Sequence, residues 1–197
     1  MKFVDKLGTE FDVRTPALSD FEQIKRICED RFGKGYITEE EFKEWIKNPD
    51  FCKVAVYGET VAGIVYLMPE TPEALAKALK LDEEYVKRAS NGKKVIHSRC
   101  AALDVEFEHR GLTPILHNVI FGNIDKNVYG AIFAPAWTYN GYTPMKKYLE
   151  REGFGFIGNR ENIWYDMDGY ECVICKGRCK CDAAIFEKTF YQEEKKL

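Results

Sequence analysis

Residues 95–124 read VIHSRCAALDVEFEHRGLTPILHNVIFGNI and predict a buried strand, a short loop and a helix. The strand prediction rests on the apolar positions Ala101, Ala102, Leu103 and Val105. Thr113 followed by Pro114 is typical of a helix start, because threonine caps a helix and proline lacks only an N–H that has no partner there. Apolar residues then recur at helical spacing, at Ile115, Leu116, Val119, Ile120 and Ile124.

The junction between this strand and this helix predicts an anion site. A helix N-terminus carries unpaired backbone N–H groups and the positive end of the helix dipole. A tight loop from a strand into a helix places both at one point, where a phosphate is the typical ligand. The same pattern occurs at ordinary strand–loop–helix junctions of α/β domains, so this stretch alone leaves both interpretations open.

The composition is that of an ordinary globular protein. At 197 residues, 45% hydrophobic and 31% charged, the chain is long enough for one domain with a small appendage. The net charge of −3 argues against a nucleic-acid partner. No apolar run approaches the ~20 residues of a membrane span, and the N-terminus lacks the apolar core of a secretory signal. Seven cysteines without an export signal predict a cytoplasmic protein with thiols or metal ligands rather than disulfides.

The rest of the sequence mixes helices and strands. Ser19-x-x-Glu22 and Thr38-x-x-Glu41 are capping boxes that predict two early helices. Gly58 and Glu59 separate two apolar runs and predict a hairpin over 53–57 and 61–68. We further expect strands over 11–14, 129–137, 154–157, 162–167 and 182–191, a helical segment over 71–92, and a helix over 144–152. This order predicts an α/β fold whose central sheet holds parallel and antiparallel pairs.

The order of elements, together with three segments, resembles the GCN5-related N-acetyltransferase superfamily over about residues 11–167. The three segments are the hairpin, the loop around Arg110-Gly111, and LEREGF (Leu149–Phe154). The resemblance implies an acetyltransferase-like domain over residues 1–168, with a mostly antiparallel sheet flanked by helices. In such proteins the loop carries R-x-x-G-x-G/A and its amides hold the pyrophosphate of acetyl-coenzyme A. The splayed end of the preceding strand pairs with the pantetheine arm.

When the motif is aligned with this sequence, Arg110 matches its arginine, and Gly111 and Leu112 fill its variable positions. Thr113 and Ile115 stand where small residues are usual, and Pro114 removes one N–H that could have bound the pyrophosphate. The resemblance implies these acetyl-CoA-binding residues: Leu103, Asp104, Val105, Arg110, Gly111, Leu112, Thr113, Pro114 and Ile115.

Acetyl transfer to an amine needs a base for the amine and an acid for the leaving thiolate. Asp104 and Glu106 alternate along the predicted strand and would share one face, so either is a candidate base. Leu149 stands where the superfamily frequently has a tyrosine acid, which leaves Tyr139 and Tyr142 as candidates. A solvated strand end and a surface loop are the alternative interpretations of these two pairs. His97 and His117 are alternatives for proton transfer, and backbone amides near Leu103–Val105 could polarise the acetyl carbonyl.

The pattern Cys172-x-x-Cys175-x-x-x-Cys179-x-Cys181 predicts a metal site in a C-terminal extension over residues 169–197. Four thiolates complete a tetrahedral zinc shell, and Lys176, Arg178 and Lys180 would offset its negative charge. Gly177 can relieve the tight turn between the pairs. An iron–sulfur cluster and free reduced thiols remain the alternatives.

Together these features predict a cytoplasmic N-acetyltransferase in which an amine attacks acetyl-CoA directly within a ternary complex. The acceptor is a small-molecule or peptide amine, no nucleic acid or membrane is involved, and a homodimer is compatible with the sequence. The alternative is a non-catalytic acyl-CoA-binding or metal-stabilised interaction module on the same fold. Pro114, Ile115 and Leu149 favour that alternative.

Overall fold

A computed structural model describes residues 1–191 of the chain. The chain divides into two compact units, which are described separately. Unit 1 comprises Met1–Leu67, Cys100–Ile124 and Met167–Cys179, and unit 2 comprises Met68–Arg99, Asp125–Asp166 and the chain from Lys180. The sequence QEEKKL at 192–197, expected to be a fraying tail, lies outside the described residues. The predicted boundary after residue 168 stays a prediction.

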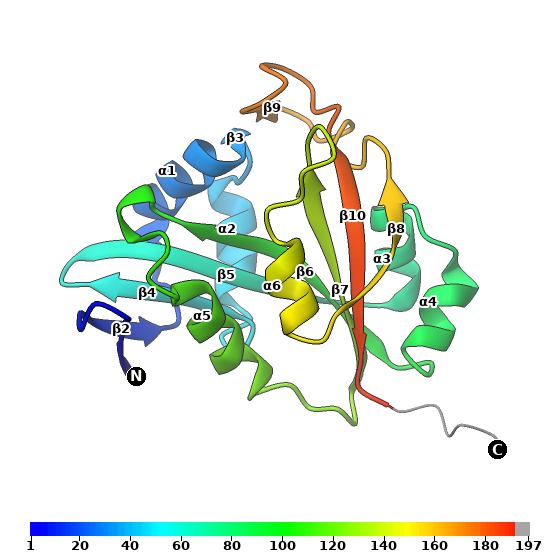
Figure 1. Ribbon diagram of the computed structural model, residues 1–197, viewed down its shortest axis with the longest axis horizontal. Coiled ribbons are helices and arrows are strands. Elements are labelled where there is room, and N and C mark those ends of the chain that lie inside the picture. The colour runs from blue at the N-terminus through cyan, green and yellow to red at the C-terminus, as the bar shows by residue number, and fades with distance from the viewer. Residues whose placement is uncertain (192–197) are drawn as a thin grey trace. The chain divides into compact units, whose positions relative to one another are not determined.

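The main sheet has eight strands in the order β1-β2-β4-β5-β6-β7-β10-β8 (Figure 1). The strands are β1 (Lys2–Val4), β2 (Glu10–Arg14), β4 (Cys52–Tyr57), β5 (Thr60–Glu70), β6 (Lys94–Leu103), β7 (Tyr129–Thr138), β8 (Gly155–Arg160) and β10 (Asp182–Thr189). The β6–β7 pair is parallel, and the registered pairs on either side of it are antiparallel. This confirms the predicted mixed, mostly antiparallel sheet with flanking helices.

Unit 1 carries the helices α1 (Phe21–Arg31), α2 (Glu39–Ile46) and α5 (Leu112–Phe121). The capping box of α2 is confirmed, because Thr38 Oγ1 accepts the N–H of Glu41 and the Glu41 carboxylate accepts the N–H of Thr38. The box predicted at Ser19 is wrong. A 3₁₀ turn (Leu18–Asp20) leads into α1, and Asp20 rather than Ser19 makes the local bond by accepting the N–H of Ala17 at 2.7 Å.

The predicted hairpin in unit 1 is confirmed, with Tyr57 paired to Thr60 across the Gly58-Glu59 turn. Gly58 has φ of +59°, which a glycine adopts without steric cost. A second glycine, Gly63, sits within β5 and allows a close approach of β6. A Cβ at this position would lie 2.8 Å from the Ala102 carbonyl oxygen.

Unit 2 carries α3 (Pro72–Leu79), α4 (Glu83–Ala89) and α6 (Lys146–Arg151). The helical segment predicted over 71–92 is two helices, because the chain breaks at Lys80, which adopts the left-handed conformation with φ of +51°. The apolar side chains of α3 and α4 pack on those of the strands: Leu75, Ala76, Leu79, Val86, Val95, Ala131, Phe133, Ala183 and Ile185 are buried in one cluster.

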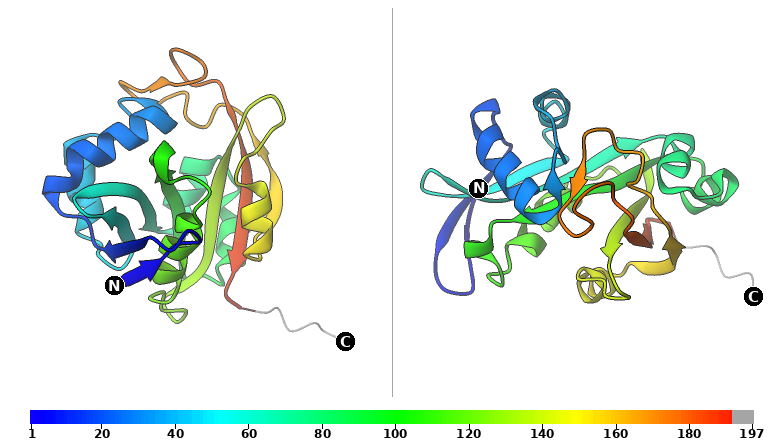
Figure 2. Two further views of the ribbon diagram at one scale, coloured as in Figure 1. Left: turned by 60° about the vertical axis from the view of Figure 1, so that its left-hand side comes forward. Right: turned by 90° about the horizontal axis from the view of Figure 1, so that it is seen from above.

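The strand predicted over 162–167 is wrong. Residues after β8 form turns, and Asn162 has φ of +52°, which interrupts an extended chain. The strand beside β8 is instead β10, which pairs with both β7 and β8 (Figure 2). The C-terminal strand that follows the cysteine segment therefore completes the core of unit 2.

Candidate functional site

The strand β6 ends at Leu103, earlier than predicted. Asp104 leaves the strand, and its Oδ1 accepts the N–H of Glu106 at 3.1 Å, which begins a 3₁₀ turn over Val105–Phe107. Val105, predicted as a strand residue, is 68% exposed. The premise that Asp104 and Glu106 share one strand face is therefore wrong, because a side-chain-capped turn replaces the alternation of the strand.

The Asp104 side chain is buried and fully engaged. Arg26 Nη2 of α1 donates to Asp104 Oδ2 at 2.5 Å, while the Asp104 N–H donates to the Ala62 carbonyl of β5 at 3.0 Å. Burial acts to raise the pKa of Asp104, but the N–H of Glu106 and the charge of Arg26 outweigh it and hold the pKa below its usual range. A carboxylate stabilised in its ionised form is a weak base. Glu106, by contrast, is exposed on the turn.

A second arginine of α1 contacts the same stretch of backbone. Arg31 Nε donates to the Leu103 carbonyl at 2.7 Å, and its Nη1 lies 3.0 Å from the Glu108 carboxylate. Arg26 and Arg31 therefore fix the end of β6 and the turn that follows it. No sequence pattern singled out these two arginines, because their partners are remote along the chain.

The helix α5 begins at Leu112, so the predicted cap at Thr113 is wrong. Gly111 is the N-cap residue and has φ of +87°, a conformation that favours glycine. Pro114 is the third residue of the helix, where a missing N–H still costs no helical bond. The N–H groups of Gly111, Leu112 and Thr113 are among those that a helix leaves without an intrahelical partner, so they can bind an anion.

Two basic residues lie at this helix start. Arg110 Nη1 is 3.5 Å from Asp5 Oδ2, and its guanidinium lies over the Phe107 ring, 5.1 Å from the centroid. Lys6 Cε would lie 3.4 Å from a Cβ placed on Gly111. Lys6 thus adds a second positive charge next to the dipole end of α5. The sequence did not predict this lysine, because the β1–β2 connection has no motif that links it to the loop.

The candidate tyrosines occupy a tight turn of unit 2 directly after β7. Tyr139 and Tyr142 pair across it through two backbone hydrogen bonds of 3.0 and 2.9 Å, with Asn140 and Gly141 in left-handed conformations between them. The two residues are 45% and 70% exposed. Leu149, which stands at the position where the superfamily frequently has a tyrosine, is buried in α6. Burial also raises the pKa of the Tyr148 hydroxyl next to it in the sequence.

The two histidines named as alternatives for proton transfer are buried, and so is the thiol of Cys100. His117 Nδ1 lies 3.0 Å from the Thr113 carbonyl one turn back in α5. His97 Nδ1 lies 3.3 Å from Glu70 Oε2. Cys100 Sγ lies 3.9 Å from Cys28 Sγ, and both thiols are buried.

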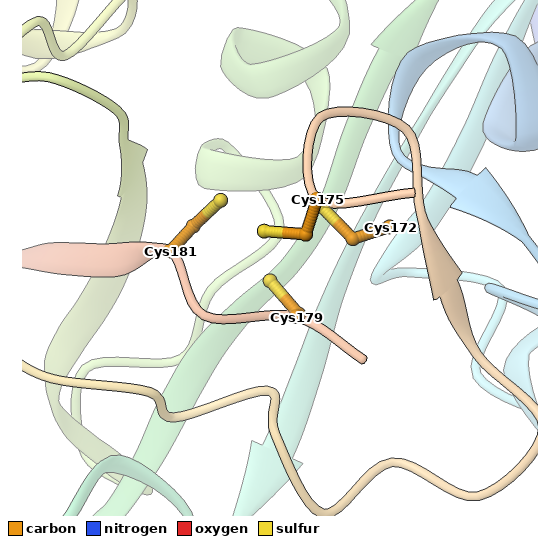
Figure 3. A group of neighbouring side chains, drawn as sticks. All are labelled: Cys172, Cys175, Cys179 and Cys181. Carbon is orange, nitrogen blue, oxygen red and sulfur yellow. The ribbon is translucent and has the colours of Figure 1, made fainter. Parts of the chain in front are cut away.

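The four clustered cysteines bring their sulfur atoms together (Figure 3). The sulfurs of Cys172, Cys175, Cys179 and Cys181 all lie within 4.8 Å of one another. A tetrahedral zinc ion with Zn–S bonds of about 2.3 Å would place its ligands about 3.8 Å apart. The donor set and its spacing therefore fit a tetrahedral thiolate site after small side-chain adjustments.

A compact turn prepares this cluster. The N–H of Cys172 donates to the Gly177 carbonyl at 2.8 Å, and the N–H of Lys176 donates to the Cys172 carbonyl at 2.9 Å. Lys176 rather than Gly177 takes the left-handed conformation, with φ of +55°. Burial acts to raise the pKa of Cys172, but the N–H groups of Cys175 and Ile174 and neighbouring thiols lower it overall.

No protein-family model matches the sequence, and no functionally curated protein matches it. Solved structures do match. Arabidopsis thaliana NAA60 in complex with acetyl-CoA aligns with a TM-score of 0.65 over 91% of this chain and 99% of that one, at 15% identity. The chain has the GCN5-related N-acetyltransferase fold.

Two further structures with this acetyltransferase fold align over most of both chains. Arabidopsis thaliana Naa50, bound to the bisubstrate analogue CoA-Ac-MVNAL, gives a TM-score of 0.64 at 14% identity, covering 91% of this chain and 99% of that one. The ribosomal-protein-S18-alanine N-acetyltransferase of Escherichia coli gives 0.59 at 13% identity, covering 95% and 98%. These identities establish the fold and leave the reaction to be argued from the residues.

Proposed function

We propose that the chain is an acetyl-CoA-dependent N-acetyltransferase that acts on an amine of a small molecule or a peptide. The observation that carries the proposal is the start of α5. Gly111, Leu112 and Thr113 offer backbone N–H groups at the positive end of the helix, and Arg110 and Lys6 lie beside them. Such a combination of dipole, amides and cations suits a pyrophosphate.

The strand before this loop supports the same proposal. The parallel register of β6 with β7 runs from Lys94 to His97, whereas β6 continues to Leu103. An extended stretch of strand beyond that register can pair with another extended chain, and the amide-rich pantetheine arm is such a chain. The structures of NAA60 with acetyl-CoA and of Naa50 with a CoA-peptide analogue have the same fold.

The reaction we propose is direct attack within a ternary complex. The neutral amine attacks the thioester carbonyl, the carbon–sulfur bond breaks, and the thiolate leaves as coenzyme A after taking a proton. Two carboxylates were predicted from the sequence as the base that takes a proton from the amine. Glu106 is exposed and is the one we propose for this role, whereas Asp104 is bound by Arg26. Tyr139 and Tyr142 remain the proposed sources of the proton for the thiolate.

Calorimetry with acetyl-CoA, followed by thiol release with a panel of amines, tests the proposal. Heat with a defined stoichiometry supports the cofactor site, and amine-dependent thiol release supports the enzyme. Heat without thiol release would favour the non-catalytic acyl-CoA binder, and no heat at millimolar acetyl-CoA would refute both. Lys6→Gln should weaken binding about fivefold through the loss of about 1 kcal/mol of charge attraction. Lys2→Gln, on the same hairpin but paired with Glu10 at 2.6 Å, is the matched control and should bind normally.

We further propose that Cys172, Cys175, Cys179 and Cys181 hold one structural zinc ion. The proposal rests on a complete thiolate set whose sulfurs already converge. Elemental analysis of untagged protein should find one zinc per chain, and Cys175→Ser should lose most of it. Cys52→Ala, which removes a buried thiol outside the cluster, should keep the metal. Stoichiometric iron with visible absorption would point to an iron–sulfur cluster. A folded protein that contains no metal would refute the metal site and favour four free reduced thiols.

Among residues 1–191, none of the helices has the length and apolar character needed to cross a membrane. A cytoplasmic location and a homodimer are proposals that rest on the sequence.

A further inference from the structure

Asp5 is a buried carboxylate in the turn that joins β1 to β2 in unit 1. Its side chain is fully buried, whereas its apolar neighbours Val4 and Leu7 are 62% and 73% exposed. Hydrophobic burial alone would give the opposite arrangement, because removing a carboxylate from water is costly. The burial of Asp5 therefore depends on the groups that bind it.

The two oxygens of the Asp5 carboxylate have different partners. Oδ1 accepts the N–H of Leu7 at 2.9 Å and the N–H of Thr9 at 2.8 Å, and it thereby closes the turn. Oδ2 accepts a hydrogen bond from Nη1 of Arg110 at 3.5 Å. An asparagine oxygen could also bind the two N–H groups, since they need only an acceptor. The negative charge itself serves the contact with Arg110.

Arg110 is held from two sides just before α5. Its Nη1 donates to Asp5, and its guanidinium lies over the Phe107 ring, 5.1 Å from the centroid. The Phe107 ring packs edge-on against Phe11 of β2, with the centroids 5.7 Å apart, and both residues are buried. The β1–β2 hairpin thus supplies the acid and supports the aromatic ring. An arginine that is already ordered loses less side-chain entropy when an anion binds to it.

We propose that Asp5 is a positioning residue that holds Arg110 ready to bind the pyrophosphate of acetyl-CoA; this inference rests on the proposed acetyltransferase function. A guanidinium carries several N–H donors, so a bond to one carboxylate leaves donors for a phosphate. Two effects of the Asp5 charge oppose each other. As a negative charge near an anion it weakens binding, and as the anchor of Arg110 it strengthens binding. In this chain the second effect is the larger one.

Asp5→Asn in the full chain tests the sign of the net effect. The variant keeps an oxygen for the N–H groups of the turn and loses the charge that Arg110 binds. Calorimetry should show a Kd for acetyl-CoA about fivefold higher than that of the wild type, whereas the loss of repulsion alone would lower it. Steady-state kinetics with the amine that turns over best should show a matching rise in the KM for acetyl-CoA, with kcat within about twofold.

Asp12→Asn is the matched control. It removes a carboxylate from the same hairpin, but Asp12 is 53% exposed and lies 3.0 Å from the N-terminal amine. Its Kd for acetyl-CoA should stay within about twofold of the wild type. Weakening of binding by Asp12→Asn equal to that by Asp5→Asn would assign the effect to the hairpin as a whole and overturn the inference.

A double-mutant cycle separates the positioning of Arg110 from support of the turn. Arg110→Gln should raise the Kd for acetyl-CoA at least about fivefold. In the Arg110→Gln background, Asp5→Asn should change the Kd by less than about twofold, since its effect passes through the arginine. Urea unfolding of each variant checks that it is folded. If Asp5→Asn does not fold, Asp5→Ser replaces it, because a serine hydroxyl can also accept N–H groups of a turn.

A folded variant at Asp5 that binds acetyl-CoA as tightly as the wild type, or more tightly, would overturn the inference and leave the acetyltransferase proposal intact. Weakening that persists in the Arg110→Gln background would overturn it as well, because Asp5 would then act through the turn. Wild-type affinity in Arg110→Gln alone would also overturn it, since the arginine would then contribute nothing to binding. A wild-type chain that binds no acetyl-CoA would refute both this inference and the proposed function.

Discussion

Asp104→Asn is the substitution that best separates a structural from a catalytic role at the end of β6. The carboxylate has two bonds, one from Arg26 Nη2 at 2.5 Å and one from the N–H of Glu106 at 3.1 Å. Asparagine keeps an oxygen for the N–H of Glu106 and loses the charge that Arg26 binds. The variant therefore isolates one charge-assisted hydrogen bond between α1 and the turn.

The expected cost follows from the exposure of the two partners. A hydrogen bond to a charged group contributes about 1.5–3 kcal/mol when its partner is left buried. Arg26 is 53% exposed, so its guanidinium returns to water and the cost falls to about 1–2 kcal/mol. With a urea m-value of about 2 kcal/mol per molar, the unfolding midpoint should fall by about 0.5–1 M.

Urea unfolding at pH 7 measures this cost, with Asp30→Asn as the matched control. Asp30 faces the same arginine at 3.7 Å but is 66% exposed, so its loss should cost less than about 0.5 kcal/mol. The double variant with Arg26→Gln should show a coupling of about 1 kcal/mol between Arg26 and Asp104. Equal costs for Asp104→Asn and Asp30→Asn, or zero coupling, would refute the reasoning. A 100-fold loss of kcat at unchanged stability would instead restore Asp104 as the base.

Two further perturbations test the same region. Gly63→Ala should destabilise the chain by about 2 kcal/mol and lower Tm by about 4–8 °C, because the new Cβ would lie 2.8 Å from the Ala102 carbonyl oxygen. Gly155→Ala is the control, because the nearest neighbour of a Cβ at that position lies at 4.0 Å. Equal Tm values for the two variants would contradict the close approach of β6 to Gly63. Acid should also destabilise the chain, since the pKa values of Asp5 and Asp104 are held below their usual range despite burial, by backbone N–H groups and arginines. Stability from these groups is complete above the unfolded pKa near 4 and is lost as the pH falls through the lower folded values, so the urea midpoint should hold from pH 7 to about 5 and then drop. A midpoint that rises on acidification would contradict this.

Local sequence signals predicted the local structure well. The Thr38–Glu41 box, the Gly58-Glu59 turn and the strand–loop–helix order around Arg110 each depend on residues close together in the chain. The clustering of Cys172 and Cys175 with the two later cysteines follows from spacing in the same way. Patterns of this kind succeed because the interactions that they report lie within one turn or one hairpin.

The same signals failed where a competing local bond was available. Thr113 reads as a helix cap, but Gly111 can take the left-handed conformation and starts the helix earlier. Asp104 and Glu106 read as alternating strand residues, but the Asp104 carboxylate binds the Glu106 N–H and turns the chain. A short polar side chain that can bond to a nearby backbone group competes with the strand.

The sequence by itself determined the order of the elements, the mixed sheet and the cysteine cluster, and it predicted an anion site in the loop after β6. Only the tertiary structure decided which side chains serve that loop. Arg26 and Asp104 are separated by 78 positions, and Asp5 and Arg110 by 105. No periodicity or motif connects such pairs, because they meet only when the sheet brings its strands together. The stretch at 95–124 thus predicted a phosphate site, and the fold brought Asp5 and Lys6 to the same loop.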